Sequence, residues 1–208
     1  MKALTATLTL VSNTISIRST RDDNGGTFYG VLMDGFESEF RDNTLSVTTT
    51  GRWSVVHGVR LYRSNTTAFN SRWAGNTLTV TNAATVDMTV NGISADSYAS
   101  ATIISNTISV FAPTTAYGIT KSDTHRIQGN VVNMFTRHAG SYGSVVGIHS
   151  QNSSAGTDDH IVDNRVTLDV DAPSRNPVGI SMQAGRARGN RIRIRARGAE
   201  GSGSGIYQ

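Results

Sequence analysis

The sequence contains no cysteine, which excludes disulfides, thiolate metal sites and cysteine nucleophiles. Residues that favour helices are also scarce, because the 208 residues include only 8 Leu, 4 Gln, 3 Glu and 2 Lys. This scarcity argues strongly against a helical bundle or an α/β enzyme fold. No apolar run approaches the roughly 20 residues of a membrane span. The first ten residues alternate apolar and hydroxyl side chains and do not form the apolar segment of a secretion signal.

Charge is scarce too, and it is placed unevenly. Charged residues make up 16 % of the chain, and the formal net charge is +4. Of the 19 basic residues, 17 are Arg, and six of these lie between Arg186 and Arg197. Without those six the net charge would be −2 instead of +4. Because the basic character is local, we expect no nucleic-acid partner for the chain as a whole.

What the sequence does contain is a repeat. Asn-x-apolar-x-apolar occurs seven times, at intervals of 24 to 34 residues, beginning at Asn13, Asn43, Asn76, Asn106, Asn130, Asn164 and Asn190. A glycine followed by Val or Ile alternates with it, at Gly30, Gly58, Gly92, Gly118, Gly147, Gly179 and Gly205. Val, Ile and Thr, which favour strands, together make up 58 residues. The repeat therefore indicates a solenoid built from short strands.

The residues after each Asn alternate between apolar and polar, as in Asn106-Thr-Ile-Ser-Val110. This period of two predicts a strand with one buried face. Since every unit buries the same face, we expect the strands to stack in parallel, about 4.8 Å apart. The residues after the glycines predict a second buried stack. A third is expected just before the Asn column, through Phe40, Trp73, Ile103, Ile127 and Ile161.

Three short strands in each unit of about 29 residues predict an all-β parallel β-helix of about seven rungs. The crossover rule for parallel strands predicts that it is right-handed. We expect the Asn column to stabilise the turns, because Asn tolerates the left-handed backbone region and stacked side-chain amides can hydrogen-bond to one another.

These motifs resemble the pectate-lyase-like parallel β-helix superfamily, in which an Asn at a turn precedes short Asn-x-Ile-x-Ile strands. The resemblance covers nearly all of residues 1–208, which we interpret as a single domain. Neither end shows a capping helix, so we expect either a segment of a longer solenoid or a subunit that associates end to end.

Enzymes of this superfamily cleave acidic polysaccharides with a base beside bound Ca²⁺ or with paired carboxylates. The resemblance therefore implies catalytic candidates in two loops: Lys121, Asp123, His125 and Arg126 after Gly118, and Asp158, Asp159 and His160 in the longest unit. The catalytic clusters of polygalacturonase-like hydrolases do not assemble in this sequence. The alternative interpretation is that these are loop charges on a solvated surface. We expect no cofactor or metal, except Ca²⁺ if the chain is a lyase.

The arginine-rich strand is a candidate face for an anionic ligand, through Arg191, Arg193, Arg195 and Arg197. Alignment of the units places Arg195 over Asp169 and Arg197 over Asp171, which are favourable pairs. The same alignment places Arg191 over Arg165, a repulsive pair that suggests an acidic partner or exposure to solvent. A solvated structural face is the alternative.

The first four units carry outward hydroxyl rows, beginning with Thr14 and Ser16. Such rows resemble the ice-binding faces of some β-solenoids, but the later units break them. Thr is also simply a good residue for an exposed strand. His149 is expected to lie in one outward column between Thr120 and Ser181, rather than to bind a metal.

We interpret the chain as a structural and adhesive scaffold, such as an extracellular or cell-surface adhesin or a phage fibre. Its faces would bind a polysaccharide or a surface protein. The alternative is a polysaccharide lyase or hydrolase, or an inactive relative, that acts on an acidic polysaccharide.

Overall fold

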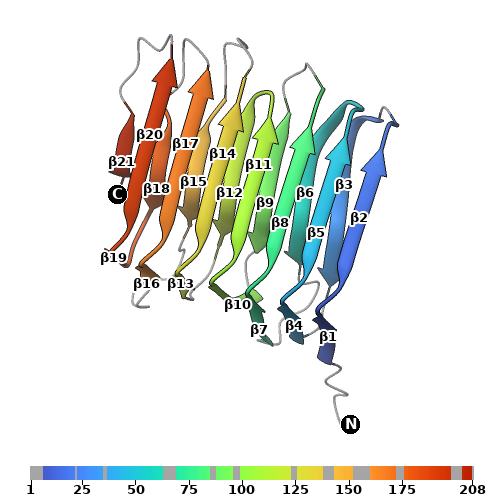
Figure 1. Cartoon of the computed structure of the whole chain (residues 1–208), viewed down its shortest axis with the longest axis horizontal. Coiled ribbons are helices and arrows are strands. Elements are labelled where there is room, and N and C mark those ends of the chain that lie inside the picture. The colour runs from blue at the N-terminus through green and yellow to red at the C-terminus, as the bar shows by residue number, and fades with distance from the viewer. Residues whose placement is uncertain are drawn as a thin grey trace.

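Figure 1 shows a computed structural model of the chain, which describes residues 7–21, 23–34, 37–62, 69–84, 88–95, 99–122, 126–137, 143–151, 160–171, 176–197 and 203–207. Within these ranges the regular secondary structure consists of strands, with no helix. The strands form three parallel sheets of seven strands each, here named A, B and C. Each winding of the chain, or rung, adds one strand to each sheet. The predicted parallel β-helix is confirmed, and its right-handed winding stays a prediction.

The strands of each sheet follow one another along the solenoid axis. Sheet A contains β1 (Thr7–Val11), β4 (Glu37–Arg41), β7 (Phe69–Ala74), β10 (Ala99–Ile104), β13 (Ile127–Gln128), β16 (His160–Val162) and β19 (Arg186–Arg188). Sheet B contains β2 (Thr14–Ser19), β5 (Thr44–Thr49), β8 (Thr77–Asn82), β11 (Thr107–Ala112), β14 (Val131–Thr136), β17 (Arg165–Asp171) and β20 (Arg191–Arg197). Sheet C contains β3 (Asp23–Asp34), β6 (Trp53–Tyr62), β9 (Thr89–Ala95), β12 (Thr115–Lys121), β15 (Val145–Ser150), β18 (Val178–Met182) and β21 (Ser204–Tyr207).

The register of the strands confirms the predicted buried stacks. In sheet B, Ile108 pairs with Leu78 on one side and Val132 on the other, and all three side chains are buried. In sheet A, Phe40 pairs with Trp73, and their ring centroids lie 5.5 Å apart. Among the described residues between the two ends, apolar side chains therefore fill the space between the sheets, and each rung covers the core of the next.

The Asn column forms a buried ladder of hydrogen bonds between rungs. In the central rung, the backbone N–H and the side-chain amide of Asn76 both donate to Asn106 Oδ1, at 3.0 and 2.8 Å. The Asn106 amide donates to the backbone carbonyls of Trp73 and Ile104, each at 3.0 Å. Asn fits this position because one side chain supplies both the acceptor and the donors that buried turn groups require.

The expectation that Asn itself takes the left-handed conformation is wrong, because the residue before it does. The residues with φ between 54° and 68° are Ser12, Asp42, Gly75, Ser105, Gly129, Asp163 and Gly189, one before each Asn. This left-handed residue turns the chain from sheet A into sheet B and leaves the Asn side chain directed into the ladder.

The glycine column is explained by close packing between sheets B and C. A Cβ built on Gly92 would lie 2.5 Å from the carbonyl oxygen of Gly118 and 2.7 Å from Cγ2 of Ile108. The same kind of conflict recurs at Gly58, Gly118, Gly147 and Gly179. Any larger residue would therefore push sheet C away from the core side chains of sheet B. No helix long and apolar enough to cross a membrane occurs in the described ranges.

Candidate functional site

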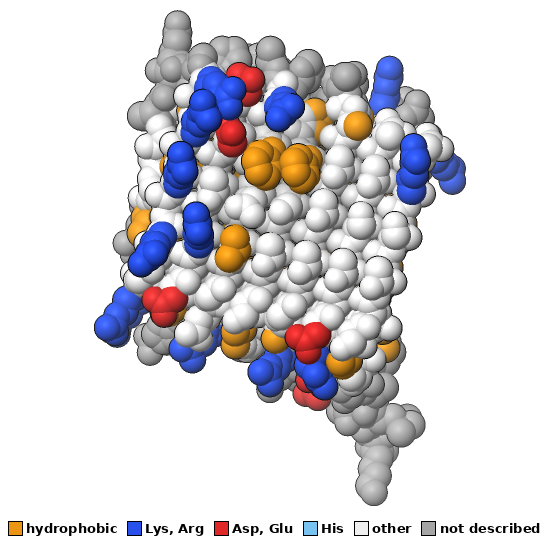
Figure 2. All heavy atoms as spheres, viewed as in Figure 1, with side chains coloured by type: hydrophobic (Ala, Val, Ile, Leu, Met, Phe, Trp, Pro, Cys, Tyr) orange, Lys and Arg blue, Asp and Glu red, His pale blue; other side chains and the backbone are white. Residues whose placement is uncertain are grey.

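The outer face of sheet B is divided into two regions with different side chains. Figure 2 shows uncharged side chains over most of this face and basic side chains gathered over its C-terminal strands. We define the hydroxyl region by the outward Ser and Thr residues of β2, β5, β8 and β11, namely Thr14, Ser16, Thr44, Ser46, Thr48, Thr77, Thr79, Thr81, Thr107 and Ser109. We define the charged region by those of β17 and β20, namely Arg165, Asp169, Asp171, Arg191, Arg193, Arg195 and Arg197.

Two phenylalanines lie at the boundary between these regions. Phe111 on β11 and Phe135 on β14 are paired in register, so both rings leave the sheet in the same direction. Their centroids lie 4.8 Å apart with an angle of 10° between the planes, and Phe111 is 39 % exposed. Stacked rings of this kind present a wide apolar surface to solvent.

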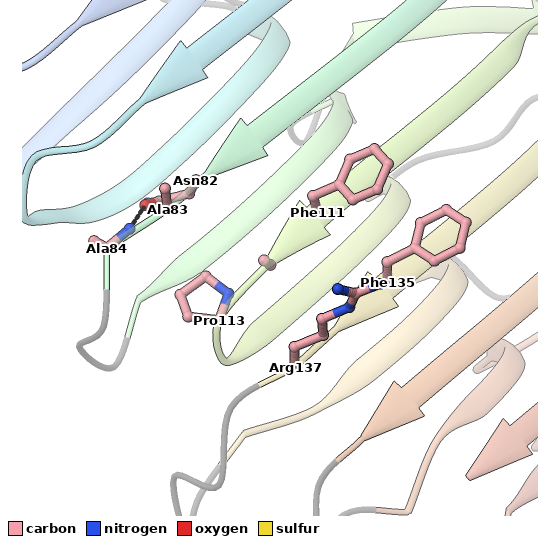
Figure 3. Close-up of a pocket in the computed structure, with 8 residues that line it drawn as sticks. Asn82, Ala83, Ala84, Phe111, Pro113, Phe135 and Arg137 are labelled. Atoms are coloured by element: carbon pink, nitrogen blue, oxygen red, sulfur yellow. Dashed lines mark hydrogen bonds between the residues drawn. The ribbon is translucent and has the colours of Figure 1, made fainter. Parts of the chain in front are cut away.

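A hollow of about 250 Å³ opens beside the two rings (Figure 3). It is lined by Asn82, Ala83, Ala84, Phe111, Ala112, Pro113, Phe135 and Arg137. The Arg137 side chain extends toward Phe135, and Asn82 Oδ1 accepts a hydrogen bond of 2.7 Å from the backbone N–H of Ala84. This bond holds the chain at one wall of the hollow. The result is a small apolar depression with a guanidinium group at one side.

A second, more polar hollow of about 270 Å³ continues from the first and shares Phe135 and Arg137 with it. It is also lined by Thr136, Asp169, Asp171 and Arg197. Arg197 Nη2 lies 3.3 Å from Asp169 Oδ1, and both side chains are partly exposed. We name the two hollows together the aromatic patch. It combines an apolar surface with donors and acceptors, the combination that small-ligand sites use for orientation.

The predicted positions of the four candidate arginines are confirmed by the register. Arg195 pairs with Asp169, Arg197 with Asp171, and Arg191 with Arg165. The ion pair itself is diagonal, between Arg197 and Asp169. Whether these arginines bind an anionic ligand stays a prediction.

The catalytic candidates are only partly described by the structure. Asp123, His125, Asp158 and Asp159 lie outside the described residues. Arg126 is exposed and directly precedes β13 of sheet A, whereas His160 begins β16 of the same sheet and pairs with Arg186.

The placement of Lys121 in a loop is wrong, because it is the last residue of β12 and is only 1 % exposed. It lies in an inward column between Ala95 and Ser150, whose small side chains leave room for it. A side chain buried in this way does not touch a polymer bound at the surface.

The outer face of sheet C carries a second group of polar and aromatic side chains. Arg60 donates a 2.8 Å hydrogen bond to the Tyr29 hydroxyl, and its guanidinium lies 5.0 Å from the Tyr62 ring centroid. The rings of Tyr29 and His57 stack 5.4 Å apart. The group is internally bonded, so its donors and ring faces are largely used within the sheet.

The predicted column of His149 is confirmed, since it pairs with Thr120 and Ser181. Burial lowers the pKa of His149 below the ordinary histidine value. Its Nδ1 is buried and has no hydrogen-bond partner among the described residues. In the part of the chain that the structure describes, no three His, Asp or Glu side chains gather in a group that could hold a metal ion.

The aromatic patch was missed by the sequence reasoning, although a signal for it exists. Phe111 and Phe135 occupy the same place, five residues after Asn106 and Asn130, in consecutive units. An aligned outward column with two adjacent aromatic rings would have predicted the stack. The hollow beside it depends on residues after the strands and could not be predicted in this way.

No known protein family, curated protein or solved structure matches this chain.

Proposed function

We propose that this chain is a structural and adhesive β-helix scaffold that binds glycan through the aromatic patch. The observation that carries the proposal is the stacked pair of Phe111 and Phe135 beside two hollows that share Phe135 and Arg137. The C–H faces of a sugar ring are apolar and pack against aromatic rings, while its hydroxyls require donors and acceptors around the rim. Arg137 and Asp169 are suited to that second role.

The regular backbone supports the scaffold part of the proposal. Strands of three sheets pair from rung to rung through the described residues, so the outer face is held by backbone hydrogen bonds rather than by mobile loops. Binding groups on such strands lose little conformational entropy when a ligand binds. With the Asn ladder, this architecture also supports a relationship to the pectate-lyase-like superfamily and an extracellular or cell-surface location, as parts of the same proposal.

The test compares two pairs of substitutions at the same place in different rungs. The variant F111A/F135A removes both rings, whereas T48A/T81A changes the equivalent outward positions on β5 and β8. We expect wild type and T48A/T81A to bind the same members of a glycan array. F111A/F135A should bind about tenfold or more weakly, because the apolar contact area of two rings is lost. Equal binding by all three proteins, or no binding to any glycan, would overturn the proposal.

The alternative proposal, a polysaccharide lyase or hydrolase, is supported by the resemblance of the repeat and by exposed Arg126 near the loop that follows β12. Incubation with pectin, alginate and related uronates, with and without Ca²⁺, tests it through the absorbance of unsaturated products. A reducing-sugar assay tests hydrolysis. Product formation that the change R126Q removes would favour the enzyme over the scaffold.

A further inference from the structure

The arginines of β20 fall into two groups that differ in their surroundings. Arg195 and Arg197 lie over the carboxylates of Asp169 and Asp171 in the preceding rung. Arg191 and Arg193 lie instead over Arg165 and Thr167, so the first half of the same strand has no carboxylate beneath it. Like charges placed directly opposite on adjacent strands destabilise the pairing unless an anion compensates them.

A hollow of about 260 Å³ lies among the uncompensated arginines. Arg165, Arg191 and Arg193 line it together with Thr167, Val166 and Ile192, and the side chains of Val166 and Ile192 belong to the apolar interior. Adjacent strands are about 4.8 Å apart and alternate residues about 6.6 Å apart, so the three arginines that line this hollow start from neighbouring backbone positions. None of these three guanidinium groups forms an ion pair or hydrogen bond with another described residue.

A second hollow, of about 360 Å³, lies on sheet A across the adjacent turn and is lined by Arg126, Arg186, Arg188 and Val162. We name these six arginines the basic corner: Arg126, Arg165, Arg186, Arg188, Arg191 and Arg193. Asp163 lies at the turn between the two hollows, and its Oδ1 lies so close to Gly189 that a Cβ at this position would collide with it. Counted over the described residues alone, one carboxylate stands against six guanidinium groups at the corner.

We propose that the basic corner binds sulfate ester groups of a sulfated glycan, with one group held by Arg165, Arg191 and Arg193. This inference rests on the proposed function for the glycan nature of the polymer, but it concerns a separate site. Three arginines around one hollow suit an anion with three free oxygens, because each planar fork can donate to one or two of them. A carboxylate or a phosphodiester has only two free oxygens and therefore accepts fewer hydrogen bonds from the three arginines.

The sheet A hollow extends the site around the corner. A linear chain that crosses the turn would place a second anionic group among Arg126, Arg186 and Arg188. The described residues that line the two hollows include no aromatic side chain on which a nucleic-acid base could stack. The chemistry of the corner therefore favours a sulfated glycan over a nucleic acid.

The test measures the affinity of the whole chain for dextran sulfate, with uncharged dextran, polygalacturonate and a single-stranded oligonucleotide as comparison ligands of known charge. The variant R191Q/R193Q removes two guanidinium groups of the corner. The control R18Q/R195Q removes the same charge from the same sheet, at two exposed positions outside both hollows of the corner. We expect the first variant to bind dextran sulfate about tenfold or more weakly and the control to lose less than about threefold.

A second variant, R191K/R193K, keeps the charge but removes the planar forks. It should bind with an affinity between those of wild type and R191Q/R193Q. All variants should stay folded, with melting temperatures that differ only slightly, because charge pairs between exposed side chains contribute little to stability. Equal losses in the Gln variant and its control would overturn the inference, since binding would then follow total charge. Equal or tighter binding of the oligonucleotide or polygalacturonate would also overturn it.

The aromatic-patch variant separates this inference from the proposed function. F111A/F135A should keep dextran sulfate binding while it loses the glycans identified on the array. A protein that binds array glycans through the rings but not dextran sulfate leaves the proposed function standing and removes the basic corner. A protein that binds dextran sulfate through Arg191 and Arg193 but binds no glycan through the rings keeps the basic corner and removes the proposed function of the aromatic patch.

Discussion

The hydroxyl and charged regions of sheet B differ on the outside and are alike on the inside. Beneath Thr44 and Ser46 lie Leu45 and Val47, and beneath Arg165 and Thr167 lie Val166 and Leu168, all buried. Because alternate residues of a strand face opposite sides, the outer row can change completely without disturbing the core. A solenoid therefore keeps its fold requirements and its binding chemistry in separate rows of residues.

The largest loss of stability is expected from substitutions in the Asn ladder, which lies beneath both the hydroxyl and the charged region. Asn43 accepts from the backbone N–H of Asn13 at 2.8 Å, and Asn164 accepts from that of Asn130 at 2.9 Å. N43A and N164A each leave buried donors and acceptors without partners, which should cost about 4 kcal/mol of unfolding free energy. Urea denaturation of each variant measures this loss. A loss in one region more than about 2 kcal/mol larger than in the other would contradict an interior of uniform construction.

A somewhat smaller loss of stability is expected from substitution of Gly118, and Gly129 in the neighbouring segment of the chain serves as its comparison. G118A places a Cβ 2.5 Å from the Gly147 carbonyl oxygen and should cost about 3 kcal/mol. G129N changes a glycine with φ of 63° and an ordinary contact of 3.5 Å, and should cost less than about 1 kcal/mol because Asn tolerates this conformation. Thermal or urea unfolding compares them. If the two substitutions cost the same, close packing between sheets does not explain the glycine column.

The aromatic stack at the boundary between the two regions can be extended by one ring into the hydroxyl region. Thr81 pairs with Phe111, so T81F would add a third ring to the stack. We expect a gain of about 0.5 kcal/mol in unfolding free energy and tighter binding of any glycan that uses the aromatic patch. T79F, one row away and facing Ser109, is the matched control and should leave glycan affinity unchanged. Calorimetric titration distinguishes the two variants.

The smallest effect is a pH dependence on sheet C. Because burial lowers the pKa of His149, the unfolded chain takes up its proton at a higher pH than the folded chain does. The contribution of His149 to the free energy of unfolding is therefore complete above the ordinary histidine pKa of about 6.5. This contribution is lost as the pH falls from there toward the lowered pKa of the folded state. Unfolding free energies of wild type and H149Q between pH 7.5 and about pH 5 test this. The unfolding free energy of wild type should fall relative to that of H149Q as the pH falls. A difference that stays constant with pH would contradict a lowered pKa of His149 in the folded state.

Much of the fold was predictable because each buried column repeats in register. Ile108, Val132 and Val166 occupy one column in the sequence alignment and one column in sheet B. The sequence does not reveal that Lys121 is buried, because its column in sheet C, with Ala95 and Ser150, contains small residues that give no hydrophobic signal. The sequence also points to Asn as the left-handed residue, one position too late, because Ser, Asp and Gly share the true position and leave no single-residue pattern.

The sequence by itself determined the strands, their parallel stacking and the two sides of each strand. These follow from a period of two and a repeat of about 29 residues, both of which are local properties of the chain. Only the tertiary structure decided which outward side chains from different rungs share a hollow, and that Arg197 pairs diagonally with Asp169. Such groupings depend on the angle between sheets and on side-chain directions across rungs, which arise only after the rungs have packed.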